Sequence, residues 1–139
     1  MGNKKIFLDT NIVADMIDEK RENYRLSLSL LKTLMVQEYE IFISEDMLST
    51  LYCISQDKKA TLAFFENIIY IDWHILPYGK RVIKEATQIS LSKGIDLEDA
   101  LQCLCAKENN CTLLITSDKK FAACGIKIVN YEGFLHKTG

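Results

Sequence analysis

The sequence has little of what marks the non-globular classes of protein. Its 139 residues include one proline and six glycines, which excludes collagen-like chains and disordered linkers. No hydrophobic run approaches the roughly 18 residues of a membrane-spanning helix, so no membrane partner is expected. An excess of positive charge is also missing, because 17 Lys and Arg stand against 19 Asp and Glu. A strongly basic nucleic-acid-binding protein is therefore not indicated, although a local patch or a metal can still attract an anionic ligand.

What is present is the composition of an ordinary globular domain. Hydrophobic residues make up 48% of the chain and charged residues 26%. A chain of this length buries enough surface to fold without a disulfide or a metal. We therefore expect a single domain over residues 1–139.

The five cysteines show no metal-binding or disulfide pattern. Cys103 and Cys105 lie inside a helical pattern, and the chain has no Cys-x-x-Cys pair. Their odd number and the lack of a secretory signal favour a cytoplasmic, reduced protein. We expect buried free thiols.

Short β-like runs alternate with helical periods along the chain. Strands are expected at 5–8, 40–44, 69–73, 112–116 and 127–129. Helices are expected at 23–36, 47–52, 59–67, 82–94 and 97–108, with Ser44 and Asp96 as N-caps. This alternation predicts an α/β fold with a mainly parallel sheet and helices on both of its faces. In such a sheet the functional site lies beyond the carboxyl ends of the strands.

Carboxylates stand at the predicted positions of such a site. Asp9 and Asp118 each follow a hydrophobic strand, and Asp99 lies in the first turn of the helix over 97–108. Clustered acids repel one another unless a cation is present. A site with oxygen ligands and without His or Cys favours Mg²⁺ or Mn²⁺, which supports phosphoryl chemistry. Turn formation and helix capping are the alternative explanations for the same residues.

Three segments, read together, resemble the PIN-domain family, whose common small members are the VapC-type toxins of toxin–antitoxin pairs. These segments are 6–12 (IFLDTNI), 96–101 (DLEDAL) and 115–121 (ITSDKKF). The likeness extends over nearly the whole chain and includes the order and spacing of its elements. It implies a PIN-like three-layer sandwich with a five-stranded, mainly parallel sheet.

The resemblance also implies a function. It implies an endoribonuclease dependent on Mg²⁺ or Mn²⁺ that hydrolyses RNA phosphodiester bonds. Asp9, Asp99 and Asp118 would be its catalytic and metal-binding acids. The supporting polar residues would be Asn11, Thr116 and Ser117. Family members commonly form homodimers and, in toxin pairs, bind a cognate antitoxin protein.

The sequence departs from the family at the second acidic position. The family places a Glu on the helix after the second strand, and the matching residue here is Thr50. A hydroxyl is a weaker, neutral ligand, so metal affinity should fall. Asp46 lies one helical turn earlier and is a candidate surrogate acid, although acids at a helix start also favour the helix dipole. Asp96 and Glu98 are further spare carboxylates, with Asp96 favoured as a cap.

Two alternative interpretations stay open at this point. A PIN-like domain weakened at Thr50 would bind RNA or a protein without cleaving. A different phosphoryl enzyme fits less well: a haloacid-dehalogenase-type phosphatase needs a second Asp two residues after the first, where Asn11 stands, and a receiver domain needs adjacent acids, which Asp9-Thr10 lacks. Lys119 and Lys120 are candidate phosphate contacts, or else part of a solvated charged surface.

Overall fold

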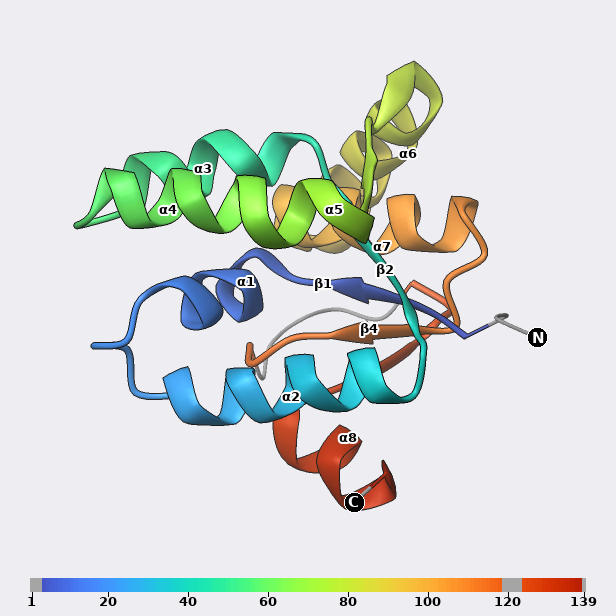
Figure 1. The fold of residues 1–139 in the computed structure, drawn as a ribbon. Helices are drawn as coiled ribbons and strands as arrows, with labels where there is room; N and C mark the ends of the chain where they lie inside the picture. Colours follow the sequence, from blue (N-terminus) through green and yellow to red (C-terminus); the bar gives the residue numbers. More distant parts are fainter. Residues whose placement is uncertain (1–3, 119–123, 139) are drawn as a thin grey trace.

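A five-stranded parallel sheet forms the centre of the protein in the computed structural model, which describes residues 4–118 and 124–138. The strands lie in the order β3-β2-β1-β4-β5, and every neighbouring pair is parallel (Figure 1). Their bounds are β1 Lys5–Leu8, β2 Glu40–Ser44, β3 His74–Leu76, β4 Leu113–Ile115 and β5 Lys127–Val129. The predicted α/β class with a five-stranded parallel sheet is confirmed.

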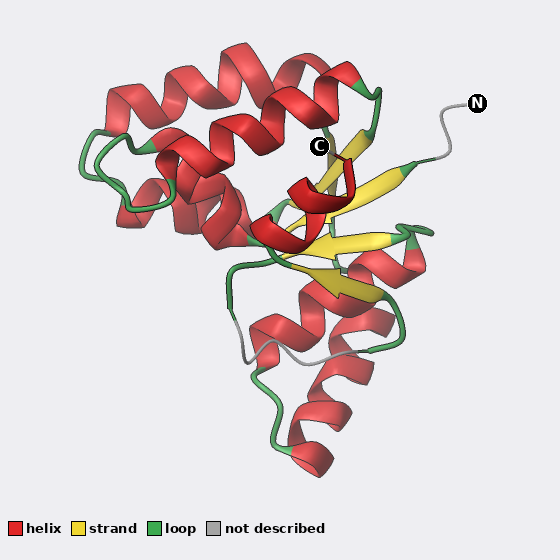
Figure 2. Cartoon of the chain, turned by 90° about the horizontal axis from the view of Figure 1, so that it is seen from below, coloured by secondary structure: helices red, strands yellow, loops and turns green. Residues whose placement is uncertain are grey.

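Helices lie on both sides of this sheet (Figure 2). The helices that precede β3 are α1 Thr10–Ile17, α2 Tyr24–Val36, α3 Asp46–Ile54, α4 Lys58–Phe64, the π-helix η1 Phe65–Ile69 and α5 Tyr70–Asp72. Those that follow it are α6 Gly79–Lys93, α7 Leu97–Glu108 and α8 Tyr131–Thr138. In the described ranges, no helix combines the length and the apolar character that crossing a membrane requires.

The central strand is buried on both of its faces. In β1, Ile6, Phe7 and Leu8 are all fully buried. A parallel strand covered by helices on both faces needs such a continuous hydrophobic run. This strand ends at Leu8, and the chain turns directly from it into α1.

Helices α6 and α7 pack against each other through small and branched side chains. Val82 and Ala86 of α6 meet Ala100 and Leu104 of α7 in a second cluster of buried residues. Gly94 ends α6 in the left-handed conformation with φ +68°, which glycine adopts without a side-chain penalty. Because α7 then begins at Leu97, this short connection fixes where the first turn of α7 lies.

The predicted strand over 69–73 is wrong. Residues 69–72 are helical, and the third strand is β3 instead. The prediction rested on the alternation of Ile69, Ile71 and Trp73, but Ile69 is fully buried and Ile71 is 75% exposed, so the two do not share one face as they would in a strand. Helices α1 and α8 were not predicted, because each has only eight residues, about two turns.

The expectation of five free thiols is also wrong. A disulfide joins Cys103 of α7 to Cys124, with 6.0 Å between their Cα atoms. Cys105 and Cys111 are free and buried, whereas Cys53 is free and exposed. The paired residues lie 21 positions apart in sequence, and only the packing of α7 beside the segment before β5 brings them together.

Thiol counting tests this pairing. After exposure to glutathione disulfide and unfolding without reductant, iodoacetamide should modify three cysteines, and after reduction all five. The matched variants are Cys103→Ser, which should give four modified thiols without reductant, and Cys53→Ser, which should give two. Mass spectrometry reads the number of adducts, and five adducts on the unreduced wild-type chain would contradict the disulfide.

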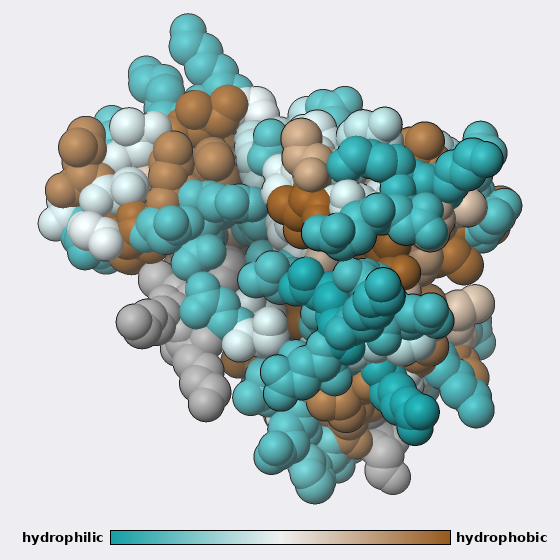
Figure 3. Space-filling view, turned by 90° about the vertical axis from the view of Figure 1, so that its left-hand side faces the viewer, coloured by the Kyte–Doolittle hydropathy of each residue, from teal (hydrophilic) through white to brown (hydrophobic). Residues whose placement is uncertain are grey.

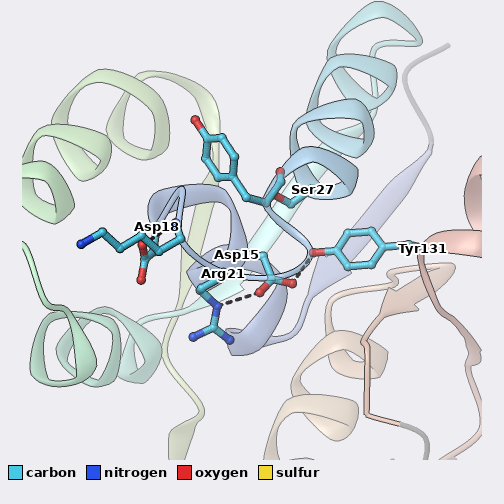
Figure 4. Close-up of polar contacts among 7 residues, drawn as sticks. Asp15, Asp18, Arg21, Ser27 and Tyr131 are labelled. Atoms are coloured by element: carbon cyan, nitrogen blue, oxygen red, sulfur yellow. Dashed lines mark hydrogen bonds and ion pairs between the residues drawn. The ribbon is translucent and has the colours of Figure 1, made fainter.

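A buried acid fixes the position of α1. Asp15 is 4% exposed and accepts two hydrogen bonds, one from Arg21 Nε and one from Tyr131 Oη, each 2.7 Å long. Figure 4 shows the carboxylate of Asp15 between these two side chains, which come from opposite sides. A buried charge that is paired and hydrogen-bonded avoids the cost of desolvation. The hydrogen bond from Tyr131 holds α1 against α8. Helix α1 begins at Thr10, directly after Asp9, so the contact also fixes the chain next to that acid.

Removing one of these donors should destabilise the fold. Tyr131→Phe deletes a hydrogen bond to a buried carboxylate, and we expect the free energy of unfolding to fall by about 1.5–3 kcal/mol. Urea denaturation measures the difference. Tyr70→Phe, at a position that is 55% exposed, is the matched control and should change stability by less than about 0.5 kcal/mol. Equal effects of the two variants would show that the Asp15 contact contributes nothing.

Candidate active site at the carboxyl edge of the sheet

Asp9 lies at the carboxyl end of the central strand and is 6% exposed. It is the N-cap of α1, and its Oδ1 accepts a hydrogen bond of 2.7 Å from the backbone N–H of Thr10. Its Oδ2 accepts another of 2.7 Å from the hydroxyl of Thr116. Burial raises the pKa of Asp9, while these hydrogen bonds act in the opposite direction. An ionised carboxylate has about four lone-pair sites, so both oxygens keep the capacity to bind a cation.

Thr116 connects the ends of the two neighbouring strands. It follows β4, which pairs with β1, and the N–H of Asp9 donates to the carbonyl of Ile115 over 3.0 Å. The hydroxyl of Thr116 accepts a hydrogen bond of 3.0 Å from the backbone N–H of Asp118. Asp118 is exposed, and its charge contributes to raising the pKa of Asp9. The structure therefore brings Asp9, Thr116 and Asp118 to one edge.

Asp99 reaches the same edge from the first turn of α7. The side chain of Asp96 caps this helix by accepting a hydrogen bond of 3.1 Å from the N–H of Asp99, as predicted. Burial and, after it, the charges of Asp96, Asp9, Asp118 and Glu98 together raise the pKa of Asp99 to about 7. The pKa of Asp99 is therefore raised by charges on its own helix and by acids that follow β1 and β4.

Glu98 and Gln102 complete the polar cluster, and Gln102 is a residue of the site that the sequence motifs do not indicate. Glu98 Oε2 lies 3.4 Å from the hydroxyl of Thr10 and 3.3 Å from Gln102 Nε2, and each of these groups donates to it. Gln102 Nε2 also donates to Thr10 Oγ1 over 3.1 Å. Burial raises the pKa of Glu98, followed by the charges of Asp9 and Asp46. The signal available in the sequence was the spacing of Glu98 and Gln102, one helical turn apart.

Helix α3 follows β2, the strand that pairs with β1 on the side opposite β4. Ser44 is fully buried, and its hydroxyl accepts a hydrogen bond of 3.3 Å from the N–H of Met47, which is the predicted capping contact. Asp46 is exposed in the first turn, and its charge reaches Glu98. Thr50 is half-buried on the same helix and forms no side-chain hydrogen bond in the described part of the chain.

The remaining candidate residues lie at the margin of this cluster. Asn11 is exposed in the first turn of α1, and Ser117 is half-buried beside Asp118. Ser117 and Asp118 line a hollow of about 360 Å³ that extends to Asn130. Figure 3 views the molecule from the side toward which β1 and β4 point, where hydrophilic residues alternate with separate hydrophobic patches. Lys119 and Lys120 fall outside the described residues.

Hard-cation chemistry suits this donor set, because every titratable group in it is a carboxylate. Among residues 4–118 and 124–138, however, no three side chains of His, Cys, Asp or Glu lie close enough together to share one metal ion. The carboxylates raise one another's pKa values without forming a closed coordination shell. A divalent cation would relieve this repulsion, so the residues present fit such an ion by donor type and by charge.

The structure is that of an α/β protein with a five-stranded parallel sheet and carboxylates beyond the carboxyl ends of its strands. Comparison with known proteins identifies the family. The chain belongs to the PIN domain family, whose profile matches residues 6–127. It is 32% identical to Ribonuclease VapC1 of Aquifex aeolicus, over 99% of this chain and 97% of that protein.

Solved structures agree on the fold. VapC20 of Mycobacterium tuberculosis, described as a Sarcin-Ricin loop cleaving toxin, is 15% identical with a TM-score of 0.70, covering 87% of this chain and 95% of that one. A DNA-bound VapBC of Salmonella typhimurium is 21% identical with a TM-score of 0.69, covering 92% and 98%. At these identities the likeness establishes the fold, and the predicted PIN-like architecture is confirmed.

The raised pKa of Asp99 makes stability depend on pH in a definite direction. Its ordinary value is 3.8 and its folded value about 7, so folding favours the protonated form. Below pH 3.8 Asp99 is protonated in both the folded and the unfolded state and does not lower the free energy of unfolding. Between pH 3.8 and about 7 its ionisation lowers this free energy progressively, and above about pH 7 the loss is complete. In EDTA, Asp99→Asn should therefore raise the melting temperature more at pH 8 than at pH 5, by about 2–4 °C for each kcal/mol of relief.

Thermal denaturation followed by circular dichroism provides the measurement. Asp72→Asn, at an exposed position on α5, is the matched control for loss of one negative charge. A melting-temperature difference between wild type and Asp99→Asn that is the same at pH 5 and pH 8 would contradict the electrostatic account.

Proposed function

We propose that this protein is a metal-dependent endoribonuclease that hydrolyses RNA phosphodiester bonds, and that it is the toxin of a toxin–antitoxin pair. The observation that supports the proposal is that Thr116 links Asp9 to Asp118 by hydrogen bonds and that the charges of both acids raise the pKa of Asp99. The similarity to Ribonuclease VapC1 over nearly the full length of both chains supports the choice of RNA as substrate.

The proposed metal is Mg²⁺ or Mn²⁺, held by Asp9, Asp99 and Asp118. Such an ion, when bound, lowers the pKa of a coordinated water and neutralises charge on the phosphate. Carboxylate oxygens are the ligands that hard cations prefer. The ion would also attach an anionic substrate to a chain whose net charge is −2.

The protein's own residues supply orientation. Two hydrogen bonds, from Thr10 N–H and Thr116 Oγ, hold the carboxylate of Asp9 in one position. The same Thr116 hydroxyl accepts from the N–H of Asp118, so the loop after β4 starts at a fixed point relative to Asp9. Pre-positioned groups of this kind lower the cost of reaching the reactive geometry. Asn11 and Ser117, at the margin of the cluster, are proposed to orient substrate or water.

Protein partners form the second part of the proposal. VapBC complexes are among the structural neighbours, and we propose that a cognate antitoxin binds this chain and that it forms a homodimer. We further propose that residues 1–139 act as one PIN domain in the cytoplasm.

Cleavage of RNA tests the proposal directly. With Mn²⁺, the wild-type protein should cleave a mixed RNA pool, and Asp9→Asn should reduce the rate by at least about 100-fold because it removes a charged ligand. Gel electrophoresis of end-labelled RNA gives the rates. EDTA should abolish the activity of the wild-type protein.

Two results would contradict the nuclease assignment. Cleavage that persists in EDTA, or that Asp9→Asn leaves unchanged, would indicate a contaminating enzyme or another mechanism. No cleavage by a folded protein that binds RNA would favour the alternative, a PIN domain that binds without cutting because Thr50 replaces the family's second acid.

A further inference from the structure

A hollow of about 360 Å³ lies beside Asp118, beyond the carboxyl ends of β4 and β5. Its walls come from three separated parts of the chain, which are the start of α2, the segment after β4 and the start of α8. Pockets for small molecules span about 300–1,000 Å³, so this hollow has room for one small planar group. Thr116, whose hydroxyl donates to the carboxylate of Asp9, is also among the lining residues. The hollow therefore adjoins the candidate active site.

Hydrogen bonds and packing hold the walls of this hollow in place. Tyr131, at the start of α8, is 5% exposed and donates from its Oη to Asp15 over 2.7 Å (Figure 4). Helices α2 and α8 also pack against each other. At the sheet, the backbone N–H of Thr116 donates to the carbonyl of Val129 over 3.0 Å and joins the ends of β4 and β5. A site whose walls are already ordered loses less entropy on binding than one that must form around its ligand.

Aliphatic side chains supply the apolar part of the lining. Leu26 of α2 is 45% exposed, and Ile128 and Val129 of β5 are half-buried. Such side chains offer contact area to the flat face of a heteroaromatic ring. Pockets for small organic ligands combine a surface of this kind with a few polar groups that fix orientation.

Two asparagine side chains supply these polar groups. Asn130 Oδ1 accepts a hydrogen bond of 2.7 Å from the N–H of Gly133, so its amide nitrogen keeps both hydrogens for a ligand. Asn23 stands at the N-cap of α2, yet its side chain forms no capping hydrogen bond. An asparagine amide offers donors and an acceptor in one plane, which allows it to pair with the edge of a nucleobase.

The charges around the hollow favour a neutral ligand over an anionic one. Asp118 and Glu132 line it, and none of the described lining residues is a Lys, an Arg or a His. A phosphate at this place would be repelled by both carboxylates, whereas an uncharged base would not. Single-stranded RNA offers such bases, because unpaired bases can turn outward and present their edges to a protein.

We propose that this hollow binds one unpaired nucleobase of the RNA, next to the phosphate that is cleaved, and that Asn23 and Asn130 recognise its edge. The inference rests on the proposed function, because it concerns the same substrate. Thr116 and Asp118 belong both to the hollow and to the acidic edge, so a base held here sets which phosphodiester bond lies at the acids. The consequence is a base preference at one position beside the cut.

Binding of ribonucleosides tests the inference without any cleavage. The full-length wild-type chain in EDTA is titrated with adenosine, cytidine and uridine, and NMR follows its asparagine side-chain amide signals. The signals of Asn23 and Asn130 should shift, and the affinities should differ by at least about 5-fold between the strongest and the weakest nucleoside. The amide of Asn67, exposed on η1, is the internal control and should not respond. Inorganic phosphate, the second probe, should shift none of these signals.

Three variants make the comparison specific. Asn130→Asp keeps the oxygen that accepts from Gly133 and replaces the donor amide by an acceptor, so it should weaken binding of the preferred nucleoside by at least about 5-fold. Asn23→Ala should also weaken binding, and it should leave the melting temperature unchanged because no capping bond is lost. Asn67→Asp is the matched control and should change neither property. Sequencing of RNA products should show that Asn130→Asp changes the base preference at one position beside the cut.

The outcomes separate this inference from the proposed function. If RNA is cleaved but no nucleoside shifts the Asn23 and Asn130 signals, or Asn130→Asp leaves the base preference unchanged, the hollow binds no base and the nuclease assignment stands. If nucleosides bind as expected but no RNA is cleaved, the hollow remains a base-binding site and only the nuclease assignment fails. Shifts that inorganic phosphate also produces, or that appear equally at Asn67, would overturn the inference.

Discussion

The hydroxyl of Thr116 joins the two central strands at the point where the site begins. It donates to the carboxylate of Asp9 at the end of β1 and accepts from the N–H of Asp118 beyond β4. One side chain therefore sets the separation of two acids that would otherwise repel each other. Because β1 and β4 are parallel neighbours, the backbone places this contact at a single edge of the sheet.

The acidic edge illustrates a conflict between folding and function. Burial and neighbouring charges raise the pKa of Asp99 to about 7, which means that the folded chain resists full ionisation there. A stability-driven design would not gather carboxylates in this way, and local conflicts of this kind concentrate at functional sites.

The hydrophobic patterns alone predicted four of the five strands, and helix α7 with its Asp96 cap, because buried parallel strands and amphipathic helices have distinct periods. They failed at residues 69–72, where the alternation of Ile69, Ile71 and Trp73 resembled a strand although the structure buries Ile69 and exposes Ile71. They also failed for the disulfide, since nothing in the local sequence of Cys103 or Cys124 shows that the two are neighbours.

The sequence by itself determined the class of fold and the three acids that the family motif carries, since these depend on local periodicity and on residue type at strand ends. Only the tertiary structure decided which further groups face those acids. The sequence indicated Asp96 as the cap of its own helix, which the structure confirms, but only the tertiary structure shows that Glu98 accepts a hydrogen bond from Thr10. The difference arises because Glu98 and Gln102 of α7 form hydrogen bonds with Thr10 at the start of α1, which lies far away in the sequence.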